Sequence, residues 1–168
     1  MERVLEPEVM DTWEESVAYD AMDFEAVNRA FAELALTLAP ATGRVLDAGT
    51  GTARIPILLC QMSPRLEVTG IDLSKNMLLI GEQNVQRANL QIQIKLEYGD
   101  AKQLHYPDGQ FDLVISNSLI HHLPDPLPFL RELKRVLKPQ GGILLRDLLR
   151  PADVITVDAL VAGIGLEY

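Results

Sequence analysis

Apolar and polar residues follow two different periods along most of this chain. Five short runs of strand character lie at residues 44–48, 66–72, 92–98, 111–116 and 142–149. Between them, apolar residues recur every three or four positions, which is the period of an amphipathic helix. Repeated strand–helix units of this kind predict an α/β fold with a mostly parallel sheet, helices on both faces and right-handed crossovers.

Local signals predict where several helices begin and end. Ser74 stands where its hydroxyl can cap the helix after the second strand, and residues 125–126 combine an aspartate cap with a proline in the first turn. That later helix is predicted to end at residues 138–142, which contain a proline and two glycines. A further amphipathic helix ends at Pro40, and its apolar residues are Val27, Ala30, Phe31, Leu34, Ala35 and Leu38.

The length of 168 residues predicts one domain with a single sizeable core. Hydrophobic residues make up 48% and charged residues 23%, proportions that are typical of a folded globular protein. We divide the chain into an N-terminal helical cover at residues 1–43, a strand–helix core at 44–150, and a short C-terminal helix and tail at 151–168.

The charge composition limits the class of partner. There are 15 basic and 24 acidic residues, which give a net charge of -9. Nucleic-acid binding depends on clustered basic side chains that meet phosphates, so this balance disfavours it. Lys134, Arg135 and Lys138 are predicted to lie on a solvated helix face. A small, neutral or cationic molecule is the expected partner.

The sequence gives no sign of a disulfide framework, a metal centre or a membrane span. Cys60 is the single cysteine and lies in an apolar run, where it is expected to pack as a small core residue. The acidic N-terminus lacks the pattern of a secretion signal, and no apolar stretch approaches the ~20 residues that a bilayer-spanning helix needs. We therefore expect a cytoplasmic protein.

The loop after the first strand carries the strongest chemical signal. It reads Asp-Ala-Gly-Thr-Gly, and its glycines allow a sharp turn and the close approach of a ligand to the backbone. A dinucleotide fingerprint would need a third glycine at position 54, where this chain has arginine. A carboxylate at Asp47 would repel a pyrophosphate, but it suits an ammonium and a sulfonium group. The loop, with Gly49, Thr50 and Gly51, therefore predicts S-adenosylmethionine as the ligand.

Two further acidic residues follow the next two strands. Asp72 can accept hydrogen bonds from ribose hydroxyls, and capping of the following helix is its structural alternative. Leu73 and Met77 are placed either against an adenine face or in the core. Asp100 can accept a hydrogen bond from the adenine amino group, while the backbone N–H of Ala101 donates to a ring nitrogen. Acids at the ends of three successive strands are a more specific signal than any one of them.

Five motifs resemble, in their order and spacing, those of class I S-adenosylmethionine-dependent methyltransferases: VLDAGTGTARIP, VTGIDLS, YGDAKQL, FDLVISNSLIHHL and LRELKRVLKPQGG. The similarity is greatest to the small-molecule branch that includes ubiquinone- and menaquinone-biosynthesis enzymes. The resemblance covers about residues 15–150 and implies a Rossmann-like, doubly wound sheet with bound S-adenosylmethionine. It places cofactor contacts on Asp47, Gly49, Gly51, Asp72, Asp100, Ala101 and Asn117.

The residues after the fourth strand are expected to face the methionyl group and a small-molecule methyl acceptor. Asn117 closes that strand, and His121 and His122 follow it. Imidazoles titrate near neutral pH, so either histidine can act as a general base, and structural hydrogen bonding is the alternative for both. By its resemblance to the family, Tyr19 belongs to a segment that covers the cofactor and excludes water. The acceptor and the atom methylated stay open.

The sequence departs from this family after the fifth strand. The family's sheet normally has two more strands, whereas residues 152–162 predict one helix that is followed by a short tail. The fifth strand would then be an exposed apolar edge. Three explanations stay open: a truncated product, closure of this edge by a second copy or another chain, and an unusually minimal fold. A methyltransferase is the main expectation, and an S-adenosylmethionine-binding module without independent catalysis is the alternative.

Overall fold

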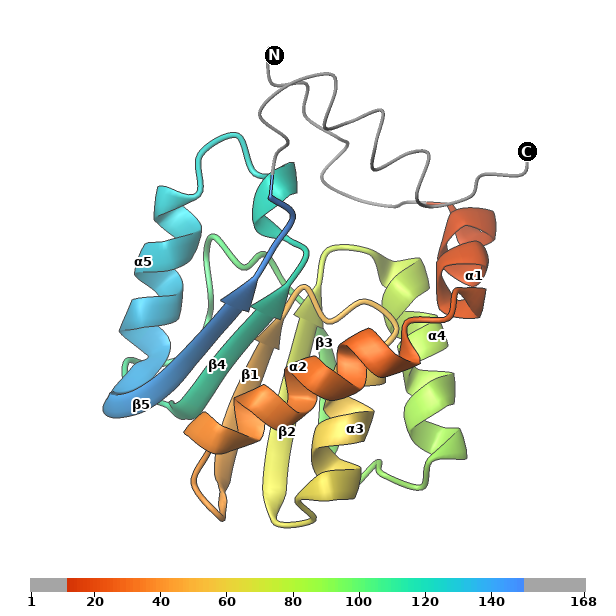
Figure 1. Ribbon diagram of the computed structural model, residues 1–168. Helices are drawn as coiled ribbons and strands as arrows, with labels where there is room; N and C mark the ends of the chain where they lie inside the picture. The colour runs from red at the N-terminus through yellow and green to blue at the C-terminus, as the bar shows by residue number, and fades with distance from the viewer. Residues whose placement is uncertain (1–11, 150–168) are drawn as a thin grey trace.

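A β-sheet with helices packed on both faces makes up residues 12–149, the part of the chain that the computed structural model describes (Figure 1). In chain order, its elements are α1 (Trp13–Ala21), α2 (Glu25–Leu38), β1 (Gly43–Ala48), α3 (Arg54–Met62), β2 (Leu66–Asp72), α4 (Lys75–Arg87), β3 (Ile94–Tyr98), β4 (Phe111–Asn117), a short 3-10 turn (Ile120–His122), α5 (Leu127–Val136) and β5 (Leu137–Arg146).

The five strands are hydrogen-bonded in the order β3-β2-β1-β4-β5, and all of their pairings are parallel. The chain moves outward from β1 to β3 and then returns to β4 on the other side of β1. This order confirms the predicted Rossmann-like sheet. It also brings the carboxyl ends of the strands to one edge, with the reversal of strand order beside β1, which is where ligands of such sheets bind.

Side chains of the central strands alternate between two apolar cores, one on each face of the sheet. Val45 of β1 belongs to the core that includes residues of α2, α3 and α4, whereas Leu46 belongs to the core under α5. In β4, Leu113 and Ile115 point into the first core and Val114 into the second. Because both faces are covered, β4 has the nearly continuous apolar sequence expected of such a strand.

Several predicted boundaries and burials are confirmed. The helix α4 begins after Ser74, whose Oγ accepts a hydrogen bond from the N–H of Met77 at 3.2 Å. Cys60 is buried in the first core, and burial raises the pKa of its thiol to about 12. The strand β3 starts at Ile94 rather than at residue 92, because Ile92 is fully exposed in the preceding turn.

The predicted apolar face of α2 is partly wrong. Val27 and Leu34 were expected in the core, but they are 53% and 52% exposed. The face of α2 that packs on the sheet is rotated by one residue relative to the predicted face. Its residues recur every three or four positions, as on one side of a helix. Its buried members are Asn28, Phe31, Ala32 and Ala35.

The strand β5 begins at Leu137, directly after α5, whereas the sequence predicted that the fifth strand starts at residue 142. Opposite Phe111–Leu113 of β4 the register shifts, which marks a bulge in β5. Proline and glycine are tolerated in a strand that is bulged and lies at the edge of a sheet. At Gly141 a Cβ would come within 2.6 Å of Cδ1 of Leu137, so the bulge depends on this glycine.

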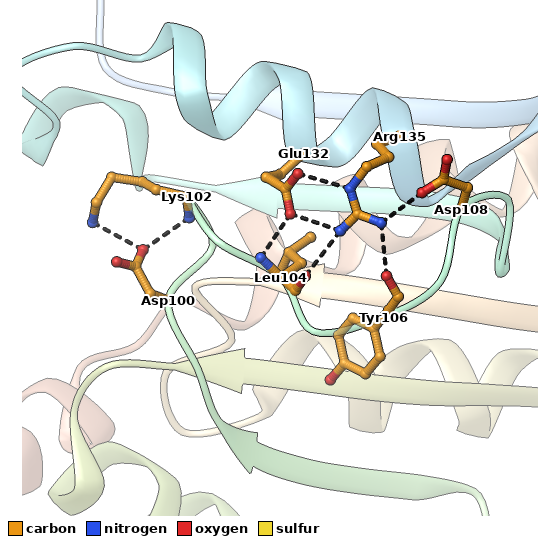
Figure 2. Close-up of polar contacts among 7 residues, drawn as sticks. All are labelled: Asp100, Lys102, Leu104, Tyr106, Asp108, Glu132 and Arg135. Carbon is orange, nitrogen blue, oxygen red and sulfur yellow. Dashed lines mark hydrogen bonds and ion pairs between the residues drawn. The ribbon is translucent and has the colours of Figure 1, made fainter.

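Two charged residues fasten the loop between β3 and β4 to α5 (Figure 2). Arg135 donates to the carbonyls of Tyr106 at 2.7 Å and Leu104 at 2.9 Å, while Glu132 accepts the N–H of Leu104 at 2.7 Å. The prediction of a solvated basic face is therefore wrong for Arg135. It is also wrong for Lys138, which lies in β5 and forms an ion pair with an aspartate of β4 at 2.6 Å.

We expect the substitution Arg135→Met to lower the free energy of unfolding by about 1 to 2 kcal/mol, because Glu132 and two backbone carbonyls lose a charged donor that is partly exposed. Equilibrium unfolding in urea measures the change. Lys134→Met is the matched control: Lys134 is exposed on the same helix and has no side-chain hydrogen bond within residues 12–149. Equal unfolding free energies of the two variants would contradict the role given to Arg135.

The strand β5 lies at the edge of the sheet, as the sequence predicted for the fifth strand. Within residues 12–149 it pairs with β4 alone, and Ile143 on it is 43% exposed. The helix predicted at residues 152–162 lies outside the described residues. None of the helices between residues 12 and 149 has the length and apolar character required to cross a membrane.

Candidate active site

The loop at residues 47–53 turns sharply where β1 ends. Gly49 and Gly51 have φ values of +78° and +54°, a region that residues with a Cβ rarely adopt. A Cβ at Gly49 would also lie 3.3 Å from side-chain atoms of Leu119. The two glycines therefore produce a turn whose backbone is open to close approach by a ligand.

The end of β2 holds this loop in place. The carbonyl of Ile71 accepts the N–H groups of Gly49 and Thr50, each at 2.9 Å. Next to it, Oδ2 of Asp72 accepts the N–H of Gly51 at 2.9 Å. Asp72 is thus part of the attachment of the glycine loop as well as a predicted ribose-binding residue.

Both carboxylate oxygens of Asp72 have a backbone partner. Besides the bond from Gly51, Oδ1 accepts the N–H of Ser74 at 2.8 Å. Burial raises the pKa of the Asp72 carboxyl, although the backbone N–H groups and the charge of His122 oppose the rise. An ionised carboxylate offers about four lone-pair positions, so acceptor capacity is left for ribose hydroxyls. The geometry is compatible with ribose binding, which stays a prediction.

Three buried oxygen atoms of the glycine loop have no hydrogen-bond partner within residues 12–149: Oδ2 of Asp47, Oγ1 of Thr50 and Oγ1 of Thr52. Buried polar atoms in proteins are nearly always paired, so a group of unpaired ones indicates a ligand-dependent site. All three atoms can accept a hydrogen bond, the two threonine hydroxyls can also donate one, and Asp47 adds a carboxyl group that a cation would hold ionised. This set fits a cationic, donor-bearing ligand such as S-adenosylmethionine and does not fit a pyrophosphate.

Burial raises the pKa of Asp47 to about 7. The side chain of Thr50 lowers this pKa, whereas the charge of nearby Asp72 raises it. Because this value lies above the ordinary value of 3.8, ionisation of Asp47 opposes folding. Its contribution to stability is therefore complete below pH 3.8 and is lost as the pH rises through about 7.

We expect the substitution Asp47→Asn to increase the free energy of unfolding of the ligand-free protein at pH 8.5 by a few kcal/mol, because it removes a buried charge. At pH 5.5 the difference should be about half as large, because the native carboxyl is protonated there while that of the unfolded chain is ionised. Urea unfolding at both pH values measures it. Glu33→Gln, which neutralises an exposed carboxylate of α2, is the control and should show no such pH dependence. A native-like pH profile of Asp47→Asn would contradict the assignment.

Two adjoining cavities open at the carboxyl ends of the strands. The smaller, of about 30 Å³, lies at β2 and β3, and its walls include Gly49, Asp72, Leu73, Asp100 and Ala101. The larger, of about 510 Å³, extends to β4 and β5, and its walls include Tyr19, Gly49, Gly51, Asp72, Met77, Asn117, His121 and His122. The structure thus brings most of the predicted site residues together, whereas Asp47 and Thr50 are buried and line neither cavity.

The residues predicted to contact the adenine differ in their surroundings. Figure 2 shows that Asp100 faces Lys102: its Oδ1 accepts the backbone N–H of Lys102 at 2.8 Å and pairs with Nζ at 2.9 Å. A contact of Asp100 with an adenine amino group would have to use its remaining lone pairs. Of the two candidates for packing on the ring, Leu73 lines the smaller cavity, whereas Met77 lines the larger one and is 5% exposed.

The two histidines on the wall of the larger cavity differ in their surroundings. Nδ1 of His121 lies 2.7 Å from Oδ1 of Asp147, whereas Nδ1 of His122 is buried without a hydrogen-bond partner in the described part of the chain. Burial raises the pKa of Asp147, but hydrogen bonds from His121 and two backbone N–H groups outweigh burial and hold this pKa below its usual range. Asp147 is therefore an ionised acceptor, and His121 is the better-oriented candidate for a general base.

Arg146 and Asp147 are among the residues of the larger cavity that were not predicted from the sequence. They stand at the carboxyl end of β5, and the rule that drew attention to acids at the ends of β1, β2 and β3 would also have found Asp147. Arg146 donates from Nε to Oδ1 of Asn117 at 2.7 Å, so it fixes the side chain predicted to face the methionyl group.

The helix α1 covers the glycine loop. Tyr19 lines the larger cavity, and its Cε1 is 3.8 Å from the position that a Cβ would take at Gly51. Asn84 of α4 joins the cover to the loop: its Nδ2 donates to Oδ1 of Asp20 at 2.9 Å and to the carbonyl of Thr52 at 3.1 Å. Tyr19 thus lies over the glycine loop, and its contact with the cofactor stays a prediction.

A Rossmann-like sheet with this glycine loop and with acids at three strand ends defines a nucleotide-type cofactor domain. The chain belongs to the methyltransferase domain family, whose model matches residues 46–145. A demethylmenaquinone methyltransferase from Listeria welshimeri is 39% identical over 108 residues, which is 64% of this chain and 45% of the relative. A protein of that name from Geobacillus kaustophilus is 39% identical over 109 residues, 64% of this chain and 46% of its own. The chain spans about half the length of the curated relatives it matches.

Solved structures show the same fold. A Methanococcus maripaludis structure, described as an S-adenosyl-L-methionine-dependent methyltransferase, has a TM-score of 0.78 at 23% identity and covers 98% of this chain and 74% of its own. The YcgJ protein from Bacillus subtilis has a TM-score of 0.66 at 29% identity, over 80% of this chain and 56% of its own. The cyclase SpnF reaches 0.63 at 26% identity, over 68% and 41%. The last example shows that the fold hosts more than one reaction.

Proposed function

We propose that this chain is an S-adenosylmethionine-dependent methyltransferase that acts on a small molecule. The observation that carries the proposal is the buried Asp47, whose Oδ2 has no hydrogen-bond partner within residues 12–149, under a glycine loop whose backbone faces a cavity. Family membership over residues 46–145 supports it. The adjoining larger cavity, of about 510 Å³, has the size of a small-molecule site and supplies room for an acceptor.

The residues around the two cavities fit successive parts of the cofactor. Leu73, Asp100 and Ala101 would hold the adenine in the smaller cavity, and Asp72 would hold the ribose. The glycine loop, Asp47 and Asn117 would hold the methionyl group, with Tyr19 as a cover. When bound, S-adenosylmethionine supplies an electrophilic methyl group. The chain's own part is to orient the acceptor and to exclude water from the larger cavity.

His121 is the proposed base for an acceptor that must lose a proton. Because Asp147 is ionised, it accepts a hydrogen bond from Nδ1 of His121, which leaves the lone pair of the neutral ring on Nε2. A hydroxyl of an acceptor in the cavity can give its proton to that nitrogen as the nucleophile forms. The curated relatives are named for demethylmenaquinone, so a reduced naphthoquinone, which carries acidic ring hydroxyls, is the first acceptor to test.

Calorimetry with S-adenosylmethionine and with NAD tests the cofactor assignment. We expect heat of binding from S-adenosylmethionine alone, and heat from NAD alone would overturn the proposal. Release of S-adenosylhomocysteine with 1,4-naphthohydroquinone or another small phenol then tests turnover. Tight cofactor binding with no release across a broad acceptor panel would favour a binding module without independent catalysis. Both measurements can be made without knowing which atom of the acceptor is methylated.

A further inference from the structure

Arg146 is a cation at the wall of the larger cavity with neutral partners only. Its Nε donates to Oδ1 of Asn117 at 2.7 Å, and its Nη1 donates to the backbone carbonyl of Val27 at 2.9 Å. Within residues 12–149 no carboxylate pairs with it, although Asp147 is the next residue in the chain. Asp147 is bonded to His121 instead. The guanidinium charge is therefore uncompensated by this part of the protein.

The surroundings of Arg146 make an uncompensated charge unfavourable. One face of the guanidinium lies over the ring of Phe31, with 4.9 Å between Cζ and the ring centroid. Partial burial lowers the pKa of the Arg146 side chain, against a small opposite effect of Tyr19. A charge removed from water needs a partner, and a guanidinium has five N–H donors in a planar fork that matches a carboxylate. Only two of these donors have partners within the described residues.

The place of Arg146 in the sheet separates it from the residues proposed to hold the adenosine. It ends β5, and β4 lies between β5 and the β1 loop, so about 10 Å of sheet separates the two strands. Asn28 of α2 lines the same cavity, is 8% exposed, and has no side-chain hydrogen bond within residues 12–149. A charged fork and an amide are thus available on the side of the cavity away from the adenosine residues.

We propose that Arg146 binds an anionic oxygen group, such as a carboxylate, of the methyl acceptor. This inference rests on the proposed function, since it assumes that the larger cavity receives an acceptor. It changes the expectation of a neutral or cationic partner that the net charge of -9 favoured. Net charge acts on encounter at long range, whereas the group that a cavity retains is decided by the charges on its walls.

A matched pair of probes tests the proposal. The full chain, saturated with S-adenosylhomocysteine, is titrated with 1-naphthol and with 1-hydroxy-2-naphthoate, which differ by one carboxylate. We expect the native protein to bind the carboxylated probe at least about tenfold more tightly, and Arg146→Met to reduce this ratio to about one. Arg146→Lys should keep part of the preference, because it keeps the charge without the fork.

Arg65→Met is the matched control, because Arg65 is exposed at the opposite end of the sheet, just before β2. It removes one arginine charge and should retain the native ratio. Affinities for S-adenosylhomocysteine and 5′-methylthioadenosine show which ligand Arg146 serves. Loss of affinity in Arg146→Met for the first of these alone would assign Arg146 to the cofactor's carboxylate and overturn the proposal. A native protein that binds the carboxylated probe no better than 1-naphthol, or binds neither, would also overturn it.

Failure of the proposed function gives a different result. In that case the native protein would not bind S-adenosylhomocysteine at all, and the probe titrations could not begin from a saturated protein. Unchanged affinity of Arg146→Met for S-adenosylhomocysteine shows in turn that the variant is folded. A general loss of structure after the bond to Val27 is removed is then excluded as the cause of a changed probe preference.

Discussion

Replacing Asp72 with alanine should weaken the binding of S-adenosylmethionine at least tenfold and up to about 100-fold. The substitution removes the acceptor for two ribose hydroxyls, each bond being worth roughly 1 kcal/mol or more. It also leaves the N–H groups of Gly51 and Ser74 without their acceptor, so the glycine loop loses one of its attachments to β2. Isothermal titration calorimetry with the full chain measures the change in affinity.

Two further variants separate the contributions of Asp72. Asp72→Asn keeps the size of the side chain, but its amide group turns a donor toward one of the two backbone N–H groups, so it should lose most of the affinity as well. Glu67→Ala removes an exposed acid from the same strand and should bind as the native protein does. Native affinity of Asp72→Ala would refute both the ribose assignment and the role of this carboxylate in holding the loop.

The part of the site built on β1, β2 and β3 was predictable from sequence for a geometric reason. In a parallel sheet the carboxyl ends of the strands meet at one edge, so Asp47, Asp72 and Asp100 were expected to be neighbours once the strands had been placed. The strands themselves were recognisable because burial on both faces imposes apolar runs. Ser74 was recognisable as a cap because a capping hydroxyl acts within one turn of its own helix.

The residues that were missed depend on contacts between distant parts of the chain. Arg135 looks like a solvated helix residue locally, and only the return of the β3–β4 loop over α5 gives it two carbonyl acceptors. The start of β5 was hidden by a proline and two glycines, which signal a loop unless a bulge at a sheet edge accommodates them. The fifth strand was also predicted to run on to residue 149, so Arg146 and Asp147 were not recognised as residues at its carboxyl end.

The choice between the two histidines shows what structure adds to a motif. Their adjacency in sequence gives them equal standing, and their rings lie 4.0 Å apart between centroids. Asp147, which directly follows β5 and lies 26 positions from His121 in the chain, forms a hydrogen bond with the ring of His121. The contact with Asp147 therefore identifies His121, rather than His122, as the candidate general base. Because the cyclase SpnF shares this fold, the fold alone does not identify the reaction. A test of the reaction therefore has to change His121 and Asp147 themselves.

The substitution Asp147→Asn should lower kcat for a phenolic acceptor about 100- to 1000-fold at pH 7, with cofactor affinity unchanged. An amide cannot stabilise the imidazolium that forms on His121, and it can reverse the tautomer by donating to Nδ1, which takes the lone pair from Nε2. Steady-state rates with 1,4-naphthohydroquinone between pH 6 and pH 10 measure the effect. The deficit should shrink at high pH, where the acceptor hydroxyl ionises without a base.

Three histidine variants make this prediction specific to the pair. His121→Asn should lose as much activity as Asp147→Asn, and the double variant should lose little more, because the two residues act as one unit. His105→Asn changes a largely exposed histidine that pairs with Glu97 outside both cavities, and it should retain native rates. A larger loss in His122→Asn than in His121→Asn, or a deficit of Asp147→Asn that stays constant with pH, would assign Asp147 to structure rather than to proton transfer.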